Sequence, residues 1–212
     1  MKINEIFYSI QGESSYAGWP CAFIRLTGCN LRCAYCDTEY AFYEGVEMTI
    51  PEILQAVDAF PTRLALVTGG EPMLQLSVHE LFEELLHRDY TVLLETGGQV
   101  SLAEVDPHVH KIMDFKCPSS GMEIHNNYGN IEYLTRKDEV KFVVGEKPDF
   151  DWACDLIQRY DIVSRVGAVV FSPIHMKLSN SELANWVLNC GLHVRLQMQL
   201  HKIIWPDIQR GV

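Results

Sequence analysis

The chain lacks several features that define large classes of proteins. None of its apolar runs approaches the ~18 residues that a transmembrane helix needs, so we expect no membrane association. The first residues, MKINEIFYSIQGES, have no basic stretch followed by a long apolar one, and a signal peptide is not expected. Basic residues are also few, with 17 Lys and Arg against 28 Asp and Glu and a formal charge of -11. General binders of the nucleic-acid backbone are usually basic, so we expect no nucleic-acid partner.

The sequence also has no low-complexity segment, fixed-period repeat or Ser/Gly-rich linker. Its 212 residues are therefore expected to form a single domain, 1–212, and the 48% of apolar residues suffice for a buried core. The seven cysteines are an odd number with three crowded together, which is not typical of a disulfide framework. We expect a cytoplasmic protein with reduced thiols that serve as metal ligands or as small buried residues.

Short apolar runs alternate with helical stretches along the chain. Their content of Val, Ile, Leu and Phe is typical of strands covered on both faces. The candidate strands are Cys21–Thr27, Arg63–Thr68, Thr91–Glu95, His110–Lys116, Glu139–Val144, Ala168–Ser172 and His193–Met198. The candidate helices are 50–60 after an N-cap at Thr49, Leu74–His87 with Leu76, Leu81, Leu85 and Leu86 on one face, Phe150–Tyr160, and Asn180–Asn189 capped by Ser179 or Ser181.

This alternation predicts a parallel sheet with right-handed crossovers. Six or seven units are too few for a complete eight-unit barrel. The expected fold class is therefore α/β, a partial, open parallel α/β barrel of about six strands. Residues 117–136 lack clear periodicity and are expected to form an irregular insertion.

Three cysteines follow the first confident strand in the segment TGCNLRCAYCDT, where Cys29, Cys33 and Cys36 form a C-x3-C-x2-C pattern. Thiolates are the natural ligands of iron–sulfur clusters. Three ligands leave one iron open, and an open metal position is where substrate chemistry takes place. A structural zinc site is the alternative, although it usually shows paired knuckles. The other cysteines are isolated and are expected to be buried apolar residues: Cys21, Cys117, Cys154 and Cys190.

This pattern, with the aromatic Tyr35 before the last cysteine, resembles the signature loop of the radical S-adenosylmethionine (SAM) superfamily. The resemblance implies a [4Fe-4S] cluster whose open iron chelates SAM, which is cleaved to a 5'-deoxyadenosyl radical. It also implies that the glycine pair and Glu71 of the GGEP motif at 69–72 bind the SAM methionine group. The SAM-binding residues predicted in this way are Tyr35, Asp37, Gly70, Glu71, Glu95, Lys116, Ser172 and His175.

Four of these residues also have an argument from the expected fold. Glu95, Lys116, Ser172 and His175 lie at or just after strand ends, and catalytic groups of α/β barrels gather at the carboxyl ends of the strands. Carboxylates in such places often bind sugar hydroxyls. The alternatives are a solvated turn carboxylate for Glu95 and a surface histidine for His175.

Motifs along the whole chain resemble the 7-carboxy-7-deazaguanine synthase family. They are EIFYSIQGES, CDT, TGGEP, ETGG, the strand ending at Lys116 and the tail HKIIWP. The resemblance implies a carbon–nitrogen lyase that contracts the ring of 6-carboxy-5,6,7,8-tetrahydropterin to 7-carboxy-7-deazaguanine, with release of ammonia, in queuosine and 7-deazapurine biosynthesis. It further implies Mg2+, a homodimer, and an external electron donor such as flavodoxin or ferredoxin. A different radical SAM enzyme and a non-enzymatic metal protein are the competing hypotheses.

The substrate residues are expected mainly in an N-terminal segment of about residues 1–20. Predicted by this resemblance are Ile10, Gln11, Gly12, Glu13, Arg25 and Thr68, with Thr38 for magnesium. Gln11 and Glu13 can pair with the amide and amino edges of a pterin, and Arg25 can hold its carboxylate. A threonine hydroxyl suits Mg2+, which favours oxygen ligands and keeps several waters. A capped turn and a structural ion pair are the alternatives for these residues.

The chain departs from the family pattern in three places. The QGE element is commonly followed by Gly, whereas Ser14 stands here, which bears on the turn and not on the pairing groups. Family members differ at the C-terminus, where a terminal carboxylate can reach the active site; here either Val212 or the turn at Trp205–Asp207 is the candidate for that part, and the sequence does not assign it. The segment Ser172–His175 also differs from that of some members, which bears on the SAM contacts predicted there.

Overall fold

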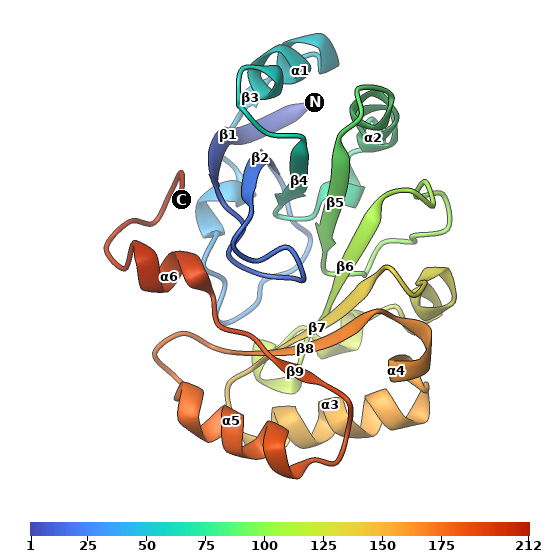
Figure 1. The fold of residues 1–212 in the computed structure, drawn as a ribbon, viewed down its shortest axis with the longest axis vertical. Coiled ribbons are helices and arrows are strands. Elements are labelled where there is room, and N and C mark those ends of the chain that lie inside the picture. The colour runs from blue at the N-terminus through green and yellow to red at the C-terminus, as the bar shows by residue number, and fades with distance from the viewer.

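The computed structural model describes all 212 residues and contains one curved nine-stranded sheet. The strand order is β3-β1-β2-β4-β5-β6-β7-β8-β9, and neighbours are parallel from β2 to β9. The strands are β1 Lys2–Ile10, β2 Pro20–Leu26, β3 Val46–Glu47, β4 Leu64–Gly69, β5 Thr91–Thr96, β6 His110–Phe115, β7 Glu139–Val144, β8 Ala168–Pro173 and β9 Arg195–Leu196. The sheet curves around an open side, which confirms the predicted partial barrel (Figure 1).

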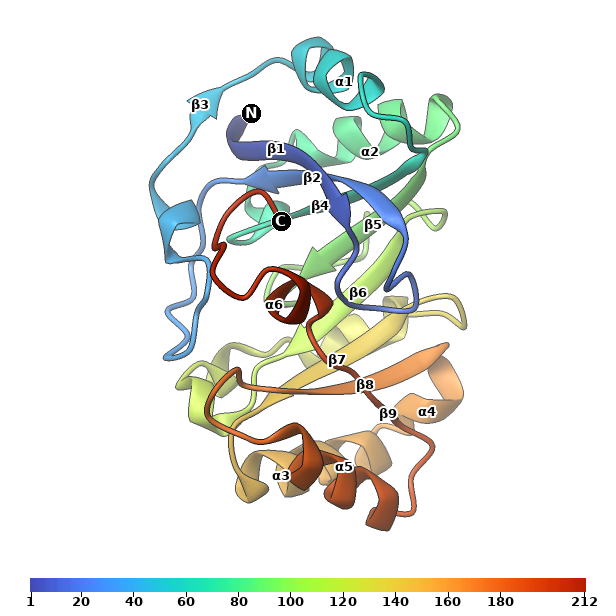
Figure 2. The same ribbon diagram turned by 60° about the vertical axis from the view of Figure 1, so that its left-hand side comes forward.

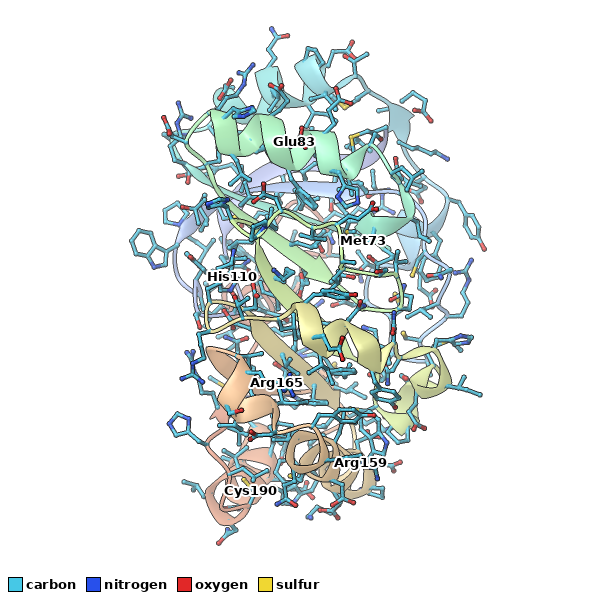
Figure 3. The ribbon with its side chains drawn as sticks, turned by 90° about the vertical axis from the view of Figure 1, so that its right-hand side faces the viewer. Met73, Glu83, His110, Arg159, Arg165 and Cys190 are labelled. Atoms are coloured by element: carbon cyan, nitrogen blue, oxygen red, sulfur yellow. The ribbon has the colours of Figure 1, made fainter.

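Five helices cover the outer face of this sheet, and a sixth lies on its open side (Figure 2). The helices are α1 Ile50–Asp58, α2 Val78–His87, α3 Lys147–Arg159, α4 Ile162–Arg165, α5 Asn180–Asn189 and α6 Leu200–Ile204. Figure 3 shows the outer side, with Glu83 on α2 and Arg159 on α3. No helix has the length and apolar character that crossing a bilayer requires.

Most predicted elements are confirmed within a few residues. The first helix begins as expected, since Thr49 and Glu52 form a capping box in which each side chain meets the other's backbone N–H. The predicted helix at Leu74–His87 is wrong in its first turn, which is a 3-10 helix, η2 Pro72–Leu74, followed by a turn. Leu76 is consequently exposed instead of lying on the buried face with Leu81 and Leu85.

The last predicted strand, His193–Met198, is reduced to the two residues of β9. The first strand, β1, has no counterpart in the sequence prediction. It pairs antiparallel with β2, and the two are joined by a loop over residues 11–19. This loop carries the predicted substrate residues Gln11 and Glu13, so β1 anchors one end of the candidate site.

The core has two layers because successive side chains of a strand point to opposite faces. The larger layer lies between the sheet and its helices and holds 38 buried residues. The smaller layer lies on the concave side and contains Cys21, Phe23, Leu64, Leu66, Leu93 and Ile112. It fills the barrel at the amino ends of the strands. Of the isolated cysteines, Cys21 and Cys117 are buried as predicted, whereas Cys154 and Cys190 are only half-buried.

The segment 117–136 is irregular, as expected, and consists of three short 3-10 helices: η3 Pro118–Ser120, η4 Glu123–His125 and η5 Tyr128–Tyr133. It is nevertheless firmly tied to the barrel. The buried Asn130 side chain donates to the Gly98 and Val100 carbonyls, both at 2.7 Å, and accepts from the Leu102 N–H at 2.9 Å. The segment therefore supports the loop that follows β5.

Candidate active site

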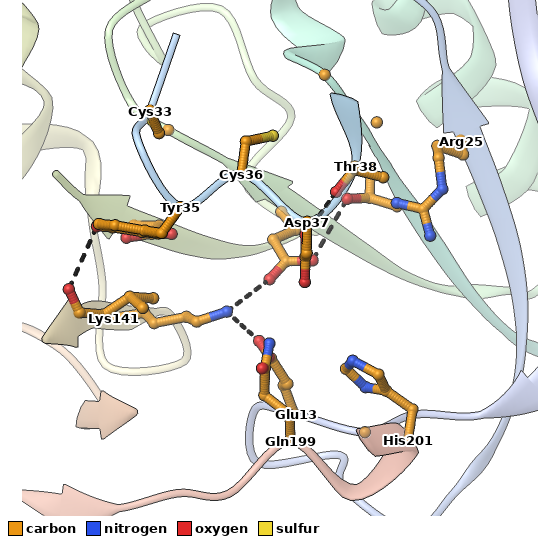
Figure 4. Close-up of a pocket in the computed structure, with 18 of the residues that line it drawn as sticks. Glu13, Arg25, Cys33, Tyr35, Cys36, Asp37, Thr38, Lys141, Gln199 and His201 are labelled. Carbon is orange, nitrogen blue, oxygen red and sulfur yellow. Dashed lines mark hydrogen bonds and ion pairs between the residues drawn. The ribbon is translucent and has the colours of Figure 1, made fainter. Parts of the chain in front are cut away.

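A cavity of about 510 Å3 lies inside the barrel, at the carboxyl ends of the strands (Figure 4). Most of the predicted site residues line it, which brings together groups from the N-terminal segment, the cysteine loop and five strand ends. They are Ile10, Gln11, Gly12, Glu13, Arg25, Cys29, Cys33, Tyr35, Cys36, Asp37, Thr38, Thr68, Gly70, Glu95, Lys116 and His175. Glu71 and Ser172 do not line it.

The three cysteines of the loop after β2 are half-buried and face this cavity. No group of three His, Cys, Asp or Glu side chains converges closely enough to hold a single metal ion. A cubane takes one thiolate on each of three different irons, so its ligands need not converge on one point, and three half-buried thiols on one loop are the donor set that it requires. Burial raises the pKa of all three thiols, so a bound cation is needed to keep them as thiolates.

The glycine pair of the GGEP motif packs against the cysteine loop. A Cβ on Gly70 would lie 2.2 Å from the Gly28 carbonyl oxygen and 2.8 Å from the Cys29 Cβ. Gly69 has a φ of +147°, and a Cβ there would lie 2.3 Å from the Leu26 carbonyl oxygen. Both glycines therefore allow close packing: Gly70 lets the GGEP loop approach the cysteine loop, and Gly69 lets the end of β4 approach the end of β2. Both also line the cavity.

Glu71 does not line the cavity and lies buried between two loops. Its fully buried carboxylate accepts hydrogen bonds from the Thr96 hydroxyl at 2.8 and 2.9 Å, from the Gly97 N–H at 2.9 Å and from the Met73 N–H at 3.0 Å. These three donors use most of its acceptor capacity, and those of Thr96 and Gly97 join the GGEP loop to the ETGG loop. The Glu71 side chain therefore holds the two loops together, and its contact with SAM stays a prediction.

A buried ion-pair network crosses the middle of the cavity (Figure 4). The Lys141 ammonium, from β7, donates to the Glu13 carboxylate and lies 3.2 Å from Glu95. Although burial disfavours the charged lysine, the two carboxylates raise the pKa of Lys141 well above its usual value. Burial raises the pKa of Glu13. At Glu95 burial also acts to raise the pKa, but the charge and hydrogen bond of Lys141, together with the charges of Arg25 and Lys116, outweigh it and lower the pKa. Lys141 thus links a predicted substrate residue to a predicted SAM residue.

Arg25 makes an ion pair and still faces the cavity. Its Nε donates to Glu5 at 2.7 Å, and Glu5 also accepts from the Tyr40 hydroxyl at 3.0 Å. The guanidinium lies 5.8 Å from the Phe7 ring centroid and 5.9 Å from that of Tyr40. Glu5 engages only the Nε edge, so it orients the guanidinium and leaves the terminal nitrogens for another carboxylate.

The end of β6 contributes a second lysine, Lys116, whose ammonium lies 2.8 Å from Asp114. Asp114 also lines the cavity and was not predicted, and its Oδ1 is buried without a hydrogen-bond partner. The hydroxyl of Ser172, on β8, is likewise buried and unpartnered. A buried polar atom without a partner is costly. The Asp114 oxygen lines the cavity, where a bound ligand can supply its hydrogen bond, whereas Ser172 does not line it.

The C-terminal tail closes one side of the cavity with residues that were not predicted individually. Gln199 donates to Glu13 at 2.5 Å, and the Leu200 N–H donates to the Gly12 carbonyl at 3.0 Å. A Cβ on Gly12 would lie 2.5 Å from Nδ1 of His201. Burial, assisted by the charge of Lys202, lowers the pKa of His201 to about 4, so this imidazole is neutral at pH 7. The only sequence signal was the HKIIWP motif, which carried no residue assignment.

Apart from the three cysteines and the C-terminal Val212, the charged side chains of the cavity balance although the chain has a formal charge of -11. Its cationic side chains are Arg25, Lys116, Lys141 and Lys202. Its anionic side chains are Glu13, Asp37, Glu95 and Asp114. Four charges of each sign suit a zwitterionic cofactor and a substrate with a carboxylate.

Comparisons with known proteins agree with this geometry. The model of the radical SAM superfamily matches residues 23–161. The 7-carboxy-7-deazaguanine synthase of Chlorobaculum tepidum is 47% identical, over 100% of this chain and 97% of the relative. That of Koribacter versatilis is 42% identical over the full length of both chains. The crystal structure of QueE from Escherichia coli has the same fold, with a TM-score of 0.77 and 22% identity over 93% of each chain.

The open barrel and the three-cysteine loop, with the match over residues 23–161, define a radical SAM protein. Within that superfamily, the chain belongs to the 7-carboxy-7-deazaguanine synthase family.

Proposed function

We propose that this chain converts 6-carboxy-5,6,7,8-tetrahydropterin to 7-carboxy-7-deazaguanine with release of ammonia, on the route to queuosine and related 7-deazapurines. The observation that carries the proposal is a single cavity with three loop cysteines on one wall and the pair Arg25 and Glu13 facing them. The relatives from Chlorobaculum tepidum and Koribacter versatilis support it by their names.

Cys29, Cys33 and Cys36 would hold the [4Fe-4S] cluster. When bound, the cluster and SAM supply the radical that starts the ring contraction. Gly70 and Glu95 would face SAM, and Lys116 and Asp114 lie beside them with one carboxylate oxygen free to accept a hydrogen bond.

The substrate would lie between the N-terminal segment and the cysteine loop. The terminal nitrogens of Arg25 would hold the pterin carboxylate, because Glu5 occupies only its Nε. Gln11 and Glu13 would pair with the heterocycle edge. Thr38 would contribute its hydroxyl oxygen to Mg2+, and that hydroxyl donates a hydrogen bond to the Asp37 carboxylate at 2.7 Å.

The tail would exclude water from this reaction. The tail covers one side of the cavity: Gln199 and Leu200 donate hydrogen bonds to the N-terminal segment, and His201 packs against it. Because His201 is neutral at pH 7, its ring can donate or accept a hydrogen bond without adding charge.

We also infer a cytoplasmic location, a homodimer and an external reductant such as flavodoxin or ferredoxin. The family resemblance supports the dimer and the reductant, and three free, half-buried thiols on one loop support a reducing compartment. No residue of the chain is assigned to either protein contact.

The experiment is an anaerobic turnover assay of the reconstituted protein with SAM, Mg2+, a reductant and 6-carboxytetrahydropterin. We expect 7-carboxy-7-deazaguanine by mass spectrometry, together with ammonia. Tetrahydropterin without the carboxylate is the matched control and should give no product. SAM cleavage without deazapurine would indicate another radical SAM reaction, and absence of SAM cleavage would contradict the enzyme class.

A further inference from the structure

The segment from Gln11 to Ser15 carries two proposed substrate residues on an unusual backbone. Ser14 has a φ of 64°, in the left-handed region that residues with a Cβ disfavour. The turn at Ser14 sets the direction of Glu13, which reaches Lys141 in the cavity. Contacts from other residues must stabilise this turn, because Ser14 by itself favours a negative φ.

Gln197 holds the turn from the side of the tail. The Ser14 N–H donates to Oε1 of Gln197 at 2.7 Å, and Nε2 of Gln197 donates back to the Ser14 carbonyl at 2.8 Å. The Gln197 backbone N–H in turn donates to the Phe171 carbonyl of β8 at 2.9 Å. One side-chain amide therefore binds both backbone groups of Ser14 and is itself fixed to the sheet.

Glu139 holds the next residue from the side of the barrel. Its two carboxylate oxygens accept the Ser15 N–H at 2.9 and 3.1 Å. Nε2 of His110, at the start of β6 (labelled in Figure 3), lies 2.9 Å from the same carboxylate, and the His110 ring meets the Tyr16 ring edge-on at 5.2 Å. Glu139 is buried and does not line the cavity, so it is placed to act on the segment and not on a ligand.

Glu139 and Lys141 lie two residues apart on β7, so their side chains share the concave face. The Ser15 N–H bonds to the Glu139 carboxylate, and the Glu13 carboxylate bonds to the Lys141 ammonium. The left-handed turn at Ser14 lies between these two contacts and connects them.

We propose that Gln197 and Glu139 are positioning residues for substrate recognition: they fix the left-handed turn at Ser14 from opposite sides and so direct Glu13 into the cavity. The inference rests on the proposed function, because it concerns binding of the carboxylated pterin. Neither residue touches the reacting atoms.

The test compares Gln197→Ala and Glu139→Ala with the control Asp138→Asn. Asp138 is an equally buried carboxylate next to β7, but it bonds to Lys111 and Thr135 and not to the N-terminal segment. We expect the two test variants to raise the KM for the pterin roughly five- to thirtyfold, as for one or two lost hydrogen bonds, with kcat changed less than about twofold. The control should lower Tm and leave KM unchanged.

Two further measurements separate positioning from general destabilisation. Hydrogen–deuterium exchange of the protein without substrate should accelerate at the Ser14 amide in Gln197→Ala and at the Ser15 amide in Glu139→Ala. Glycine adopts positive φ without penalty, so Ser14→Gly in the Gln197→Ala background should restore most of the lost substrate affinity. Ser14→Gly also relieves backbone strain and can by itself restore stability, so Tm is measured beside KM, and only a recovered KM supports the positioning role.

The outcomes distinguish the inference from the proposed function. If wild type forms the deazapurine while both test variants keep its KM, the positioning role is refuted and the proposed function stands. An equal rise of KM in Asp138→Asn, or no rescue by Ser14→Gly, also refutes it. If folded, cluster-loaded wild type forms no deazapurine, both proposals fail. Should Glu139→Ala not fold, Glu139→Gln replaces it, since the amide retains one oxygen that accepts the Ser15 N–H. Glu139→Gln should show the wild-type KM. A raised KM in Glu139→Gln together with a normal KM in Gln197→Ala counts against the inference.

Discussion

Replacing Lys141 with methionine tests whether the ion-pair network in the cavity stabilises the fold. The substitution keeps an unbranched side chain of similar length and removes the ammonium that contacts both Glu13 and Glu95. Two carboxylates would then lie in a largely buried place without their cation. We expect a clear loss of stability, because a buried charge that loses its partner retains its desolvation cost.

The burial of the three groups sets the magnitude. The side chains of Lys141 and Glu13 are 8% and 9% exposed, whereas that of Glu95 is 28% exposed. Removing one partner of a buried ion pair costs about 3–5 kcal/mol. Glu95 reaches solvent and Gln199 still donates to Glu13, so the lower end, about 3 kcal/mol, applies. A chain of this size loses about 2–4 °C of Tm per kcal/mol, which gives a fall of roughly 6–12 °C.

The loss should depend on pH. Burial already raises the pKa of Glu13, and without the opposing charge of Lys141 that pKa rises further. An acid whose pKa is higher in the folded state contributes stability below its unfolded pKa of about 4.3 and loses it as the pH rises through the folded value. The difference in Tm between wild type and Lys141→Met should therefore be largest near pH 8 and smaller near pH 5.

Thermal unfolding followed by circular dichroism at both pH values measures this difference. Adding Glu13→Gln to Lys141→Met should recover part of the lost Tm at pH 8, since it removes one of the unpaired charges. The reasoning is refuted if Lys141→Met unfolds within about 2 °C of wild type at pH 8. It is equally refuted if the deficit is the same at both pH values.

Three other substitutions test the rest of the site. Cys33→Ala should abolish SAM cleavage and the visible absorbance of the reconstituted cluster while the far-ultraviolet circular dichroism stays that of wild type; intact absorbance would contradict the ligand assignment. Arg25→Ala removes charged hydrogen bonds worth about 1.5–3 kcal/mol and should raise the KM for the carboxylated pterin roughly 10- to 150-fold, and an unchanged KM in steady-state assays would exclude this role. Gly70→Ala places a Cβ against the Gly28 carbonyl and should lower both Tm and the iron content per chain, whereas normal iron content would show that the cysteine loop tolerates the displacement.

The hydrophobic pattern was sufficient to predict the parallel strands and the principal helices. Buried parallel strands are continuous apolar runs, and helix starts such as Thr49 carry local capping signals that need no tertiary information. The first strand was missed because EIFYSIQ alternates weakly and its partner β2 was assigned only to the parallel sheet. Leu76 was misplaced because Pro72 begins a separate 3-10 turn that interrupts the helical period.

The site was predictable only where a motif marked it. The cysteine loop, Glu13 and Arg25 belong to recognisable motifs, and the structure places all of them on the cavity. Lys141 lies in the middle of an apolar strand, 128 residues from Glu13, and nothing local distinguishes it from a solvent-facing lysine. Gln197 lies 183 residues from Ser14 in the sequence, so their contact forms only once the whole chain has folded.

The motifs that the sequence suggested as separate ligand contacts form one connected structure. The Glu71 N–H donates to the Gly28 carbonyl at 2.8 Å, while the Glu71 carboxylate binds Thr96 and Gly97. The cysteine loop, the GGEP loop and the ETGG loop are therefore coupled through one buried residue. A substitution in any of them changes the position of the others, so loss of activity alone does not identify a SAM contact. In this site, a direct contact is distinguished from a positioning role only by a measurement that separates binding from folding, such as cluster content or the exchange of one amide.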